Sequence, residues 1–110
     1  MAKVAQDSTL VQLLLSLGRA KKAKPAISVT IDTVSTKIIN INKKRHSLVL
    51  TNTGANPIFI GINEPAVANQ GIYLLGNGGV WVMDSYTYTN RYMYGIAIGG
   101  ASNISIQEFE

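Results

Sequence analysis

Apolar residues near the start of the chain recur at helical spacing. Between Ser8 and Gly18, one face of a helix would carry four leucines: Leu10, Leu13, Leu14 and Leu17. Their spacing of i, i+3, i+4 and i+7 is typical of an amphipathic helix, which Asp7 or Ser8 can cap and Gly18 can end. The pattern predicts a short helix over residues 8–18.

The predicted helix has too little polar surface to stand alone in water. Val11 and Leu15 widen its apolar face, and what remains is a narrow polar stripe: Thr9, Gln12 and Ser16. Such a helix needs a partner groove. A linker over residues 19–25 follows and carries four cations: Arg19, Lys21, Lys22 and Lys24. Residues 1–25 are therefore predicted to be an N-terminal arm that binds a partner through the four leucines and these cations.

After Pro25 the period changes from helical to alternating. Apolar and polar residues alternate from Ile27 to Asp32, as in a half-buried strand. Further strands are predicted at residues 36–41, 47–51, 57–62, 71–75, 80–83, 86–88, 92–98 and 103–109, separated by turn residues at 42–45, 52–56, 76–79 and 99–102. Many short strands at this spacing predict an all-β domain over residues 26–110. The fold class is an antiparallel β-sandwich or jelly-roll-like barrel with a short N-terminal helical arm.

Composition indicates one ordered domain with a short appendage. The 110 residues are 46% hydrophobic and 15% charged, which excludes the composition of a disordered chain. A chain with so little charge suits a protein that packs against others. The longest apolar run, Leu10 to Leu17, is much shorter than the roughly 20 residues of a membrane-spanning helix, so no membrane partner is expected.

The net charge of +4 is divided unevenly along the chain. Residues 1–45 hold nine basic residues against two acidic ones, a net charge of +7, whereas residues 46–110 have a net charge of −3. A basic arm can contact phosphates or the acidic surface of a protein neighbour. The linker has no interleaved aromatic residues that would stack on bases, so nucleic acid is the less favoured partner.

Residues able to carry catalysis are sparse. The chain has no cysteine, and its one histidine, His46, has no acidic residue nearby in sequence, although a nucleophile and its base must lie within hydrogen-bond reach. Of the six carboxylates only Glu108 and Glu110 are close in sequence, and no cluster has metal-ligand spacing. The glycine-rich run at 76–79 lacks the Lys-Ser/Thr of a phosphate loop. We expect a protein that is not an enzyme and that needs no metal or other cofactor.

Aromatic residues supply a second candidate for binding. Five are crowded into residues 81–94: Trp81, Tyr86, Tyr88, Tyr92 and Tyr94. At alternate positions of a hairpin or a loop-linked strand pair, the tyrosines would pack across strands. If exposed, the rings would instead form a protein interface or stack on a sugar, because aromatic anchors concentrate binding energy. The sequence leaves these three roles open.

The β-region also carries a characteristic order of strands and turns. A strand from Arg45 to Thr51 is followed by the turn residues 52–56 and a strand from Pro57 to Gly61. Three later segments follow: Gly71 to Leu74 with the turn at 76–79, Tyr94 to Ala97 with Gly99 and Gly100, and a last strand that reaches Glu108. In this order, residues 27–110 resemble small β-structured bacteriophage virion proteins of the capsid decoration, cement or tail accessory type. The arm lies outside the resemblance.

The resemblance implies a structural virion protein, located in a particle that is assembled in the host cytoplasm. Such a protein would bind and stabilise neighbouring subunits of a phage capsid, as cement or decoration, through its β-domain and its arm. Its partners would be the major capsid protein or other virion proteins. A homo-oligomer is expected, with a trimer among the arrangements left open. The alternative is a tail, neck or fibre accessory protein that contacts a host glycan or receptor.

Overall fold

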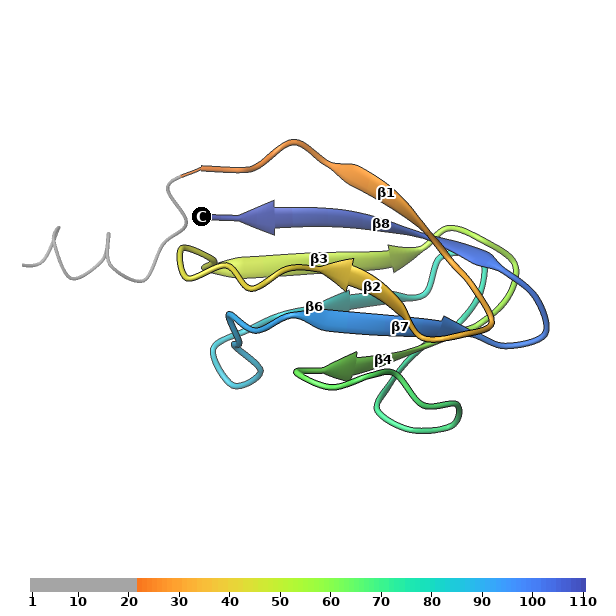
Figure 1. Cartoon of the computed structure of the whole chain (residues 1–110). Helices are drawn as coiled ribbons and strands as arrows, with labels where there is room; N and C mark the ends of the chain where they lie inside the picture. Colours follow the sequence, from red (N-terminus) through yellow and green to blue (C-terminus); the bar gives the residue numbers. More distant parts are fainter. Residues whose placement is uncertain (1–21) are drawn as a thin grey trace, which may run out of the picture.

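The computed structural model describes residues 22–110, and these residues form eight β-strands and no helix. In chain order the strands are β1 (Ile27–Ile31), β2 (Thr36–Ile39), β3 (Ser47–Asn52), β4 (Ile58–Ile62), β5 (Ile72–Leu74), β6 (Val80–Val82), β7 (Met93–Ala97) and β8 (Ser102–Phe109). They form two four-stranded antiparallel sheets (Figure 1). Sheet A has the order β1-β8-β3-β6, and sheet B has the order β2-β7-β4-β5. Within this part of the chain, no helix could cross a membrane.

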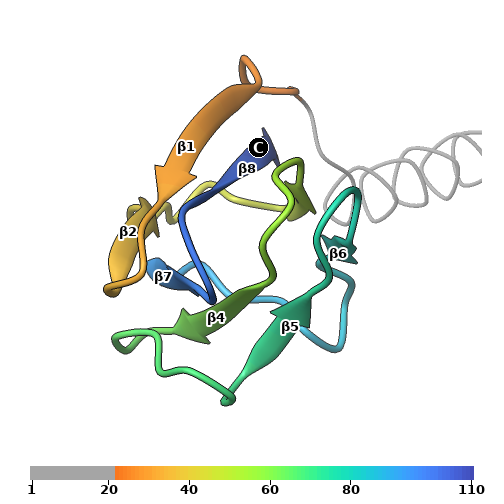
Figure 2. The same ribbon diagram turned by 90° about the vertical axis from the view of Figure 1, so that its right-hand side faces the viewer.

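Strands far apart in the sequence pair in a nested order. β1 pairs with β8, β2 with β7, β3 with β6 and β4 with β5, all antiparallel. The pairs β3–β8 and β4–β7 complete the two sheets. Viewed along the strands, the chain passes repeatedly from one sheet to the other (Figure 2). The predicted all-β, sandwich-like fold is confirmed. We call the end of the sandwich where residue 22 lies the arm end, and the opposite end the far end.

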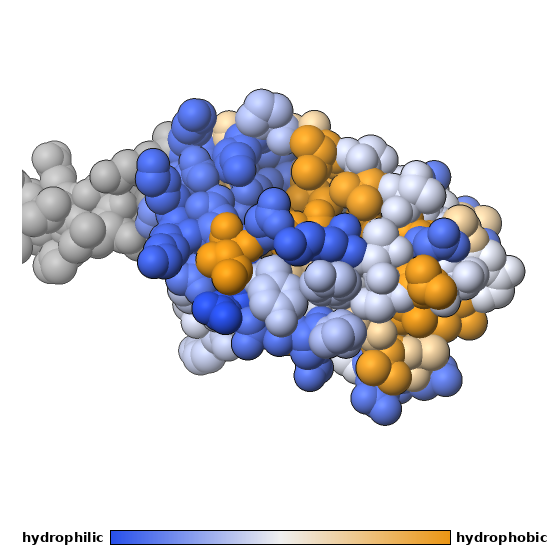
Figure 3. All heavy atoms as spheres, viewed as in Figure 1, coloured by the Kyte–Doolittle hydropathy of each residue, from blue (hydrophilic) through white to orange (hydrophobic). Residues whose placement is uncertain are grey.

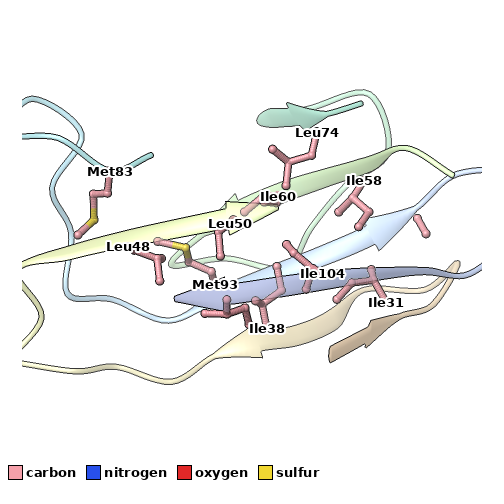
Figure 4. Close-up of a cluster of buried hydrophobic side chains, with 12 residues drawn as sticks. Ile31, Ile38, Leu48, Leu50, Ile58, Ile60, Leu74, Met83, Met93 and Ile104 are labelled. Carbon is pink, nitrogen blue, oxygen red and sulfur yellow. The ribbon is translucent and has the colours of Figure 1, made fainter. Parts of the chain in front are cut away.

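The core lies between the sheets because apolar residues occupy alternate positions of the strands. In β3 and β8 every second residue is buried. Twelve buried side chains form one cluster (Figure 4): Ile31, Ile38, Leu48, Leu50, Ile58, Ile60, Leu74, Met83, Met93, Ala97, Ile104 and Ile106. Burial of each large aliphatic side chain contributes about 1.5–3 kcal/mol, so this cluster is the main source of stability.

A buried asparagine joins the loops of the far end. Asn52, the last residue of β3, is fully buried. Its Nδ2 donates to the backbone oxygens of Asn56 (2.8 Å) and Leu74 (3.1 Å). Its Oδ1 accepts from the Ser102 hydroxyl (2.8 Å) and from the backbone N–H of Gly54 (3.1 Å). Both donor hydrogens and both acceptor sites of the amide are used, and the predicted turns at 52–56 and 99–102 are held together here.

Eight of the nine predicted strands are present, with ends that agree within two residues. The ninth, predicted at residues 86–88, is wrong because residues 85–87 form a turn. Asp84 Oδ1 accepts from the backbone N–H of Tyr86 (2.8 Å) and of Thr87 (2.9 Å), and from the Thr87 hydroxyl (3.1 Å). Such local bonds compete with the ladder of a sheet. The helix predicted at residues 8–18 lies outside the described residues.

Candidate functional site

The segment that leads into β1 is attached to the last strand. The backbone N–H of Lys22 donates to the oxygen of Glu110 (2.8 Å), and the N–H of Glu110 donates back to Lys22 (2.7 Å). The N–H of Lys24 donates to the oxygen of Glu108 (2.9 Å). These bonds continue the β1–β8 pairing toward the arm end. The chain therefore enters the sandwich along sheet A, beside the end of β8 (Figure 1).

A buried arginine joins β8 to the loops of the arm end. Arg45 is only 1% exposed. Its Nε donates to Glu108 Oε2 (2.6 Å), and its Nη2 donates to the backbone oxygen of Asn40 (2.9 Å). Its Nη1 donates to the backbone oxygens of Thr89 (3.1 Å) and Arg91 (3.0 Å). In place of water, one carboxylate and three backbone carbonyl oxygens surround the guanidinium.

Glu108 connects this arginine to the segment that precedes β1. Its Oε1 lies 3.0 Å from Lys24 Nζ, and its Oε2 lies 2.6 Å from Arg45 Nε. Burial acts to raise the pKa of the Glu108 carboxyl, but the hydrogen bonds from Arg45 and Lys24 outweigh burial, and the pKa lies below its ordinary value. The hydrogen bond with Glu108 raises the pKa of Lys24. We call Arg45, Glu108 and Lys24 the arm-end cluster.

The outer surface of sheet B carries aromatic side chains. In β7 the buried residues alternate with outward-facing ones, and the same alternation places one aromatic ring on β4 and one on β5. This aromatic face consists of Phe59, Tyr73, Tyr92, Tyr94 and Ile96. The ring centroids of Phe59 and Tyr73 are 4.9 Å apart, and those of Tyr92 and Tyr94 are 5.6 Å apart in an edge-to-face pair. Tyr73 is half exposed, so the face has a ring available to a partner.

The outer surface of sheet A is free of charge. Its outward positions, which alternate with buried or partly buried ones, are Ser28, Thr30, Ser47, Val49, Thr51, Val80, Val82, Asn103, Ser105, Gln107 and Phe109. The far-end loops at 53–57, 75–79 and 98–101 also contain no charged residue, and the β1–β2 loop at 32–35 carries one, the exposed Asp32. On the face shown in Figure 3, hydrophilic residues gather at the arm end and hydrophobic ones toward the far end. Covering an uncharged surface costs less desolvation than covering a charged one.

The structure separates the five aromatic residues singled out from the sequence. Trp81, on the edge strand β6, packs partly buried against the core. Tyr86 and Tyr88 lie in the β6–β7 loop, where Tyr86 is 96% exposed. Only Tyr92, just before β7, and Tyr94, within it, belong to the aromatic face. Of the three roles left open, packing across a hairpin would need a strand at residues 86–88, where the structure has a turn.

Two members of the aromatic face were missed from the sequence. Phe59 and Tyr73 occupy the outward positions of strands that were predicted correctly, and they lie opposite each other in the β4–β5 register. The alternation within each strand was a sufficient signal to place them outward. Their adjacency was not readable, because periodicity does not tell which strands pair.

Most of the predicted arm contacts fall outside the described residues. This holds for the leucines and for two of the cations: Leu10, Leu13, Leu14, Leu17, Arg19 and Lys21. Lys22 is described and exposed. Lys24 is engaged with Glu108, so within the described part of the linker one cation already has a partner in its own chain.

Side chains that commonly bind metals are not clustered in the part of the chain that the structure describes. In residues 22–110, no three His, Cys, Asp or Glu side chains are grouped so that they could hold a metal ion. His46 is exposed at the start of β3, and its backbone N–H donates to the oxygen of Phe109. Comparison of the chain with protein-family models, with curated proteins and with solved structures gave no match.

Proposed function

We propose that the protein is a structural subunit of a bacteriophage particle. In this role it binds neighbouring capsid subunits as a cement or decoration protein. The sandwich provides uncharged surfaces that a neighbour can cover, and the arm reaches a second subunit. In this role the protein converts no substrate. It stabilises the particle through the binding free energy of its contacts with neighbouring subunits.

The nested strand pairing supports this class of function. Eight antiparallel strands that pair first with last, second with seventh and so on toward the β4–β5 hairpin have a jelly-roll-like order. Jelly rolls serve as viral capsid domains and as lectin domains. Since one architecture hosts many functions, the surfaces and the arm carry more of the argument than the fold.

The observation that carries the proposal is the attachment of the arm to the body. Residues 22–24 are held on β8 by three backbone hydrogen bonds. The same strand supplies Glu108, which binds both Lys24 and the buried Arg45. A force on the arm therefore acts directly on β8, an inner strand of sheet A. A simple solvated tether would not require this attachment.

The arm can supply enough energy to matter. Burying the side chains of four leucines gives a gross gain of about 6–12 kcal/mol, at about 1.5–3 kcal/mol each. Ordering the arm takes part of this gain away. Repetition of the contact over a lattice makes even a small net gain decisive, because each bound arm raises the effective concentration of the next.

The proposal is tested with the full-length chain and the particle that carries it. The double variant Leu13→Asp with Leu17→Asp should fail to sediment with particles, since charged side chains cannot enter an apolar groove without a large desolvation cost. Gln12→Asp with Ser16→Asp adds the same charge to the polar stripe and should sediment like the wild type. Equal sedimentation of both double variants would overturn the role of the arm.

A second candidate function is favoured by one observation. Tyr73 is half exposed beside Phe59 on the aromatic face, and exposed rings can stack on sugars as well as on proteins. A tail, neck or fibre accessory protein would use this ring against a host glycan or receptor. Binding to an array of host surface glycans that is lost in Tyr73→Ala would favour this candidate over the capsid role.

A further inference from the structure

An apolar groove lies between the edges of the two sheets at the arm end. β1 and β2 are edge strands, and they diverge toward the arm end (Figure 1). The groove between β1 and residues 38–42 has a volume of about 440 Å³, and its apolar lining consists of Pro25, Ile27, Ile38, Ile39, Ile41 and Ile106. Ile27 is 51% exposed and Ile41 is 46% exposed. Large apolar side chains exposed together mark an interaction site.

Three of the four polar side chains that line the groove already have partners within the chain, and the fourth, Asn40, is exposed. Glu108 and Lys24, which also line the groove, form an ion pair, and Glu108 has a second partner in Arg45. Asn42 Nδ2 donates to Glu110 Oε2 (2.9 Å). An apolar occupant would therefore leave these three side chains with their present partners. The groove therefore suits a row of apolar side chains.

We propose that this groove binds the Leu10–Leu17 segment of a second copy of the chain. The inference rests on the proposed function and adds to it the site on the body that receives the arm. The segment offers a row of four leucines at helical spacing, and a groove that takes an apolar helix face is a common mode of recognition. Burial of Ile27 and Ile41 by these leucines would remove the exposed apolar surface of both partners.

The route of the chain favours a second copy over the segment's own body. Lys22 is held on β8 and lies only two residues before Lys24, which lines the groove. To reach its own groove, the segment would have to reverse direction within residues 18–21, which span at most about 14 Å. A reversal there would depend on Gly18 alone, because Arg19, Ala20 and Lys21 are not residues that favour tight turns. The segment of a second copy has no such restriction. When the arm of each copy binds the groove of the next, the contact is head-to-tail and either closes into a ring or extends along a lattice.

Disulfide trapping tests the proposal cleanly because the chain has no cysteine of its own. Full-length Ile41→Cys is mixed with full-length Leu14→Cys, which carries a different tag, and the mixture is oxidised mildly. We expect a disulfide-linked heterodimer as the main product. Val34→Cys is the control for the groove position, since Val34 is 65% exposed at the far end. It should give no heterodimer with Leu14→Cys.

Two outcomes overturn the proposal. A chain that carries both Ile41→Cys and Leu14→Cys and yields only an internally bridged monomer would make the occupant its own arm. No more heterodimer from Ile41→Cys than from Val34→Cys would show that the groove is not the binding site. If that result is found while Leu13→Asp with Leu17→Asp still abolishes co-sedimentation, the proposed function stands and the groove assignment alone fails. If the groove variant gives no extra heterodimer and the double variant sediments normally, both the groove assignment and the proposed function fail.

Discussion

Arg45→Met is the substitution that most sharply tests how the arm end is held together. Methionine keeps much of the apolar stem of arginine but removes the guanidinium. Glu108 is then left with Lys24, whose side chain is 41% exposed. Three backbone oxygens, on Asn40, Thr89 and Arg91, lose their donor. The variant thus removes one partner from a buried ion pair and loosens two loops at the same time.

The expected cost follows from the burial of the pair. Arg45 is 1% exposed and Glu108 is 6% exposed, and removing one partner of a buried pair typically costs about 3–5 kcal/mol. This is a large part of the roughly 5–15 kcal/mol that stabilises a small domain. Urea unfolding followed by the fluorescence of the single tryptophan, Trp81, measures the change as a lower midpoint at unchanged slope.

Two further variants separate the charge effect from a general effect of the turn. Lys43→Met removes an exposed cation in the same turn as Arg45 and should change the free energy of unfolding by less than about 0.5 kcal/mol. Arg45→Met with Glu108→Leu removes both charges and should recover a large part of the loss, because no buried carboxylate is left unpaired. A cost below about 1 kcal/mol for Arg45→Met would refute this account of the arm-end cluster.

Three other results are expected. The pKa of Glu108 is lower in the folded chain than its ordinary value of 4.5, so its stabilising effect is complete above that pH and disappears as the pH falls through the folded pKa. The advantage of the wild type over Glu108→Gln in urea unfolding should therefore shrink as the pH falls below 4.5, and a constant gap would contradict the assignment. A chain that begins at Lys22 should fold by circular dichroism and proton NMR, because residues 22–110 contain the whole described core; an unfolded product would make the arm part of the core. Asn52→Ala should lower the free energy of unfolding by about 1–3 kcal/mol, because the buried groups that bond the Asn52 amide lose their partner. An unchanged urea midpoint would show that water takes over these hydrogen bonds.

The strands could be predicted from the sequence because alternation is a local signal. The segments from Ile27 to Phe109 show the period of half-buried strands, and Gly and Asn mark the turns between them. The pairing of these strands is not a local property, and the nested order follows only from the structure. The failure at residues 86–88 has a specific cause, since Asp84 binds the backbone of the two residues that would have joined a ladder.

The arm-end cluster could not be predicted for a different reason. Arg45 stands in a basic turn beside Lys43 and Lys44, where a solvated side chain is the expected state. Its carboxylate partner is 63 residues away in the sequence, and the sequence shows only that Glu108 lies in the last predicted strand, near Glu110. The spacing of two oppositely charged residues does not predict an ion pair between them. That prediction would require knowing which segments of the chain are neighbours in the fold.

A cryo-electron microscopy reconstruction of the particle that carries this chain tests the central claim most directly. The account predicts a repeated two-sheet sandwich on the particle, with density for residues 10–17 of one copy against the groove formed by Ile27 and Ile41 of the next. A particle that contains the chain by mass spectrometry but shows no repeated sandwich of this kind would contradict the structural role.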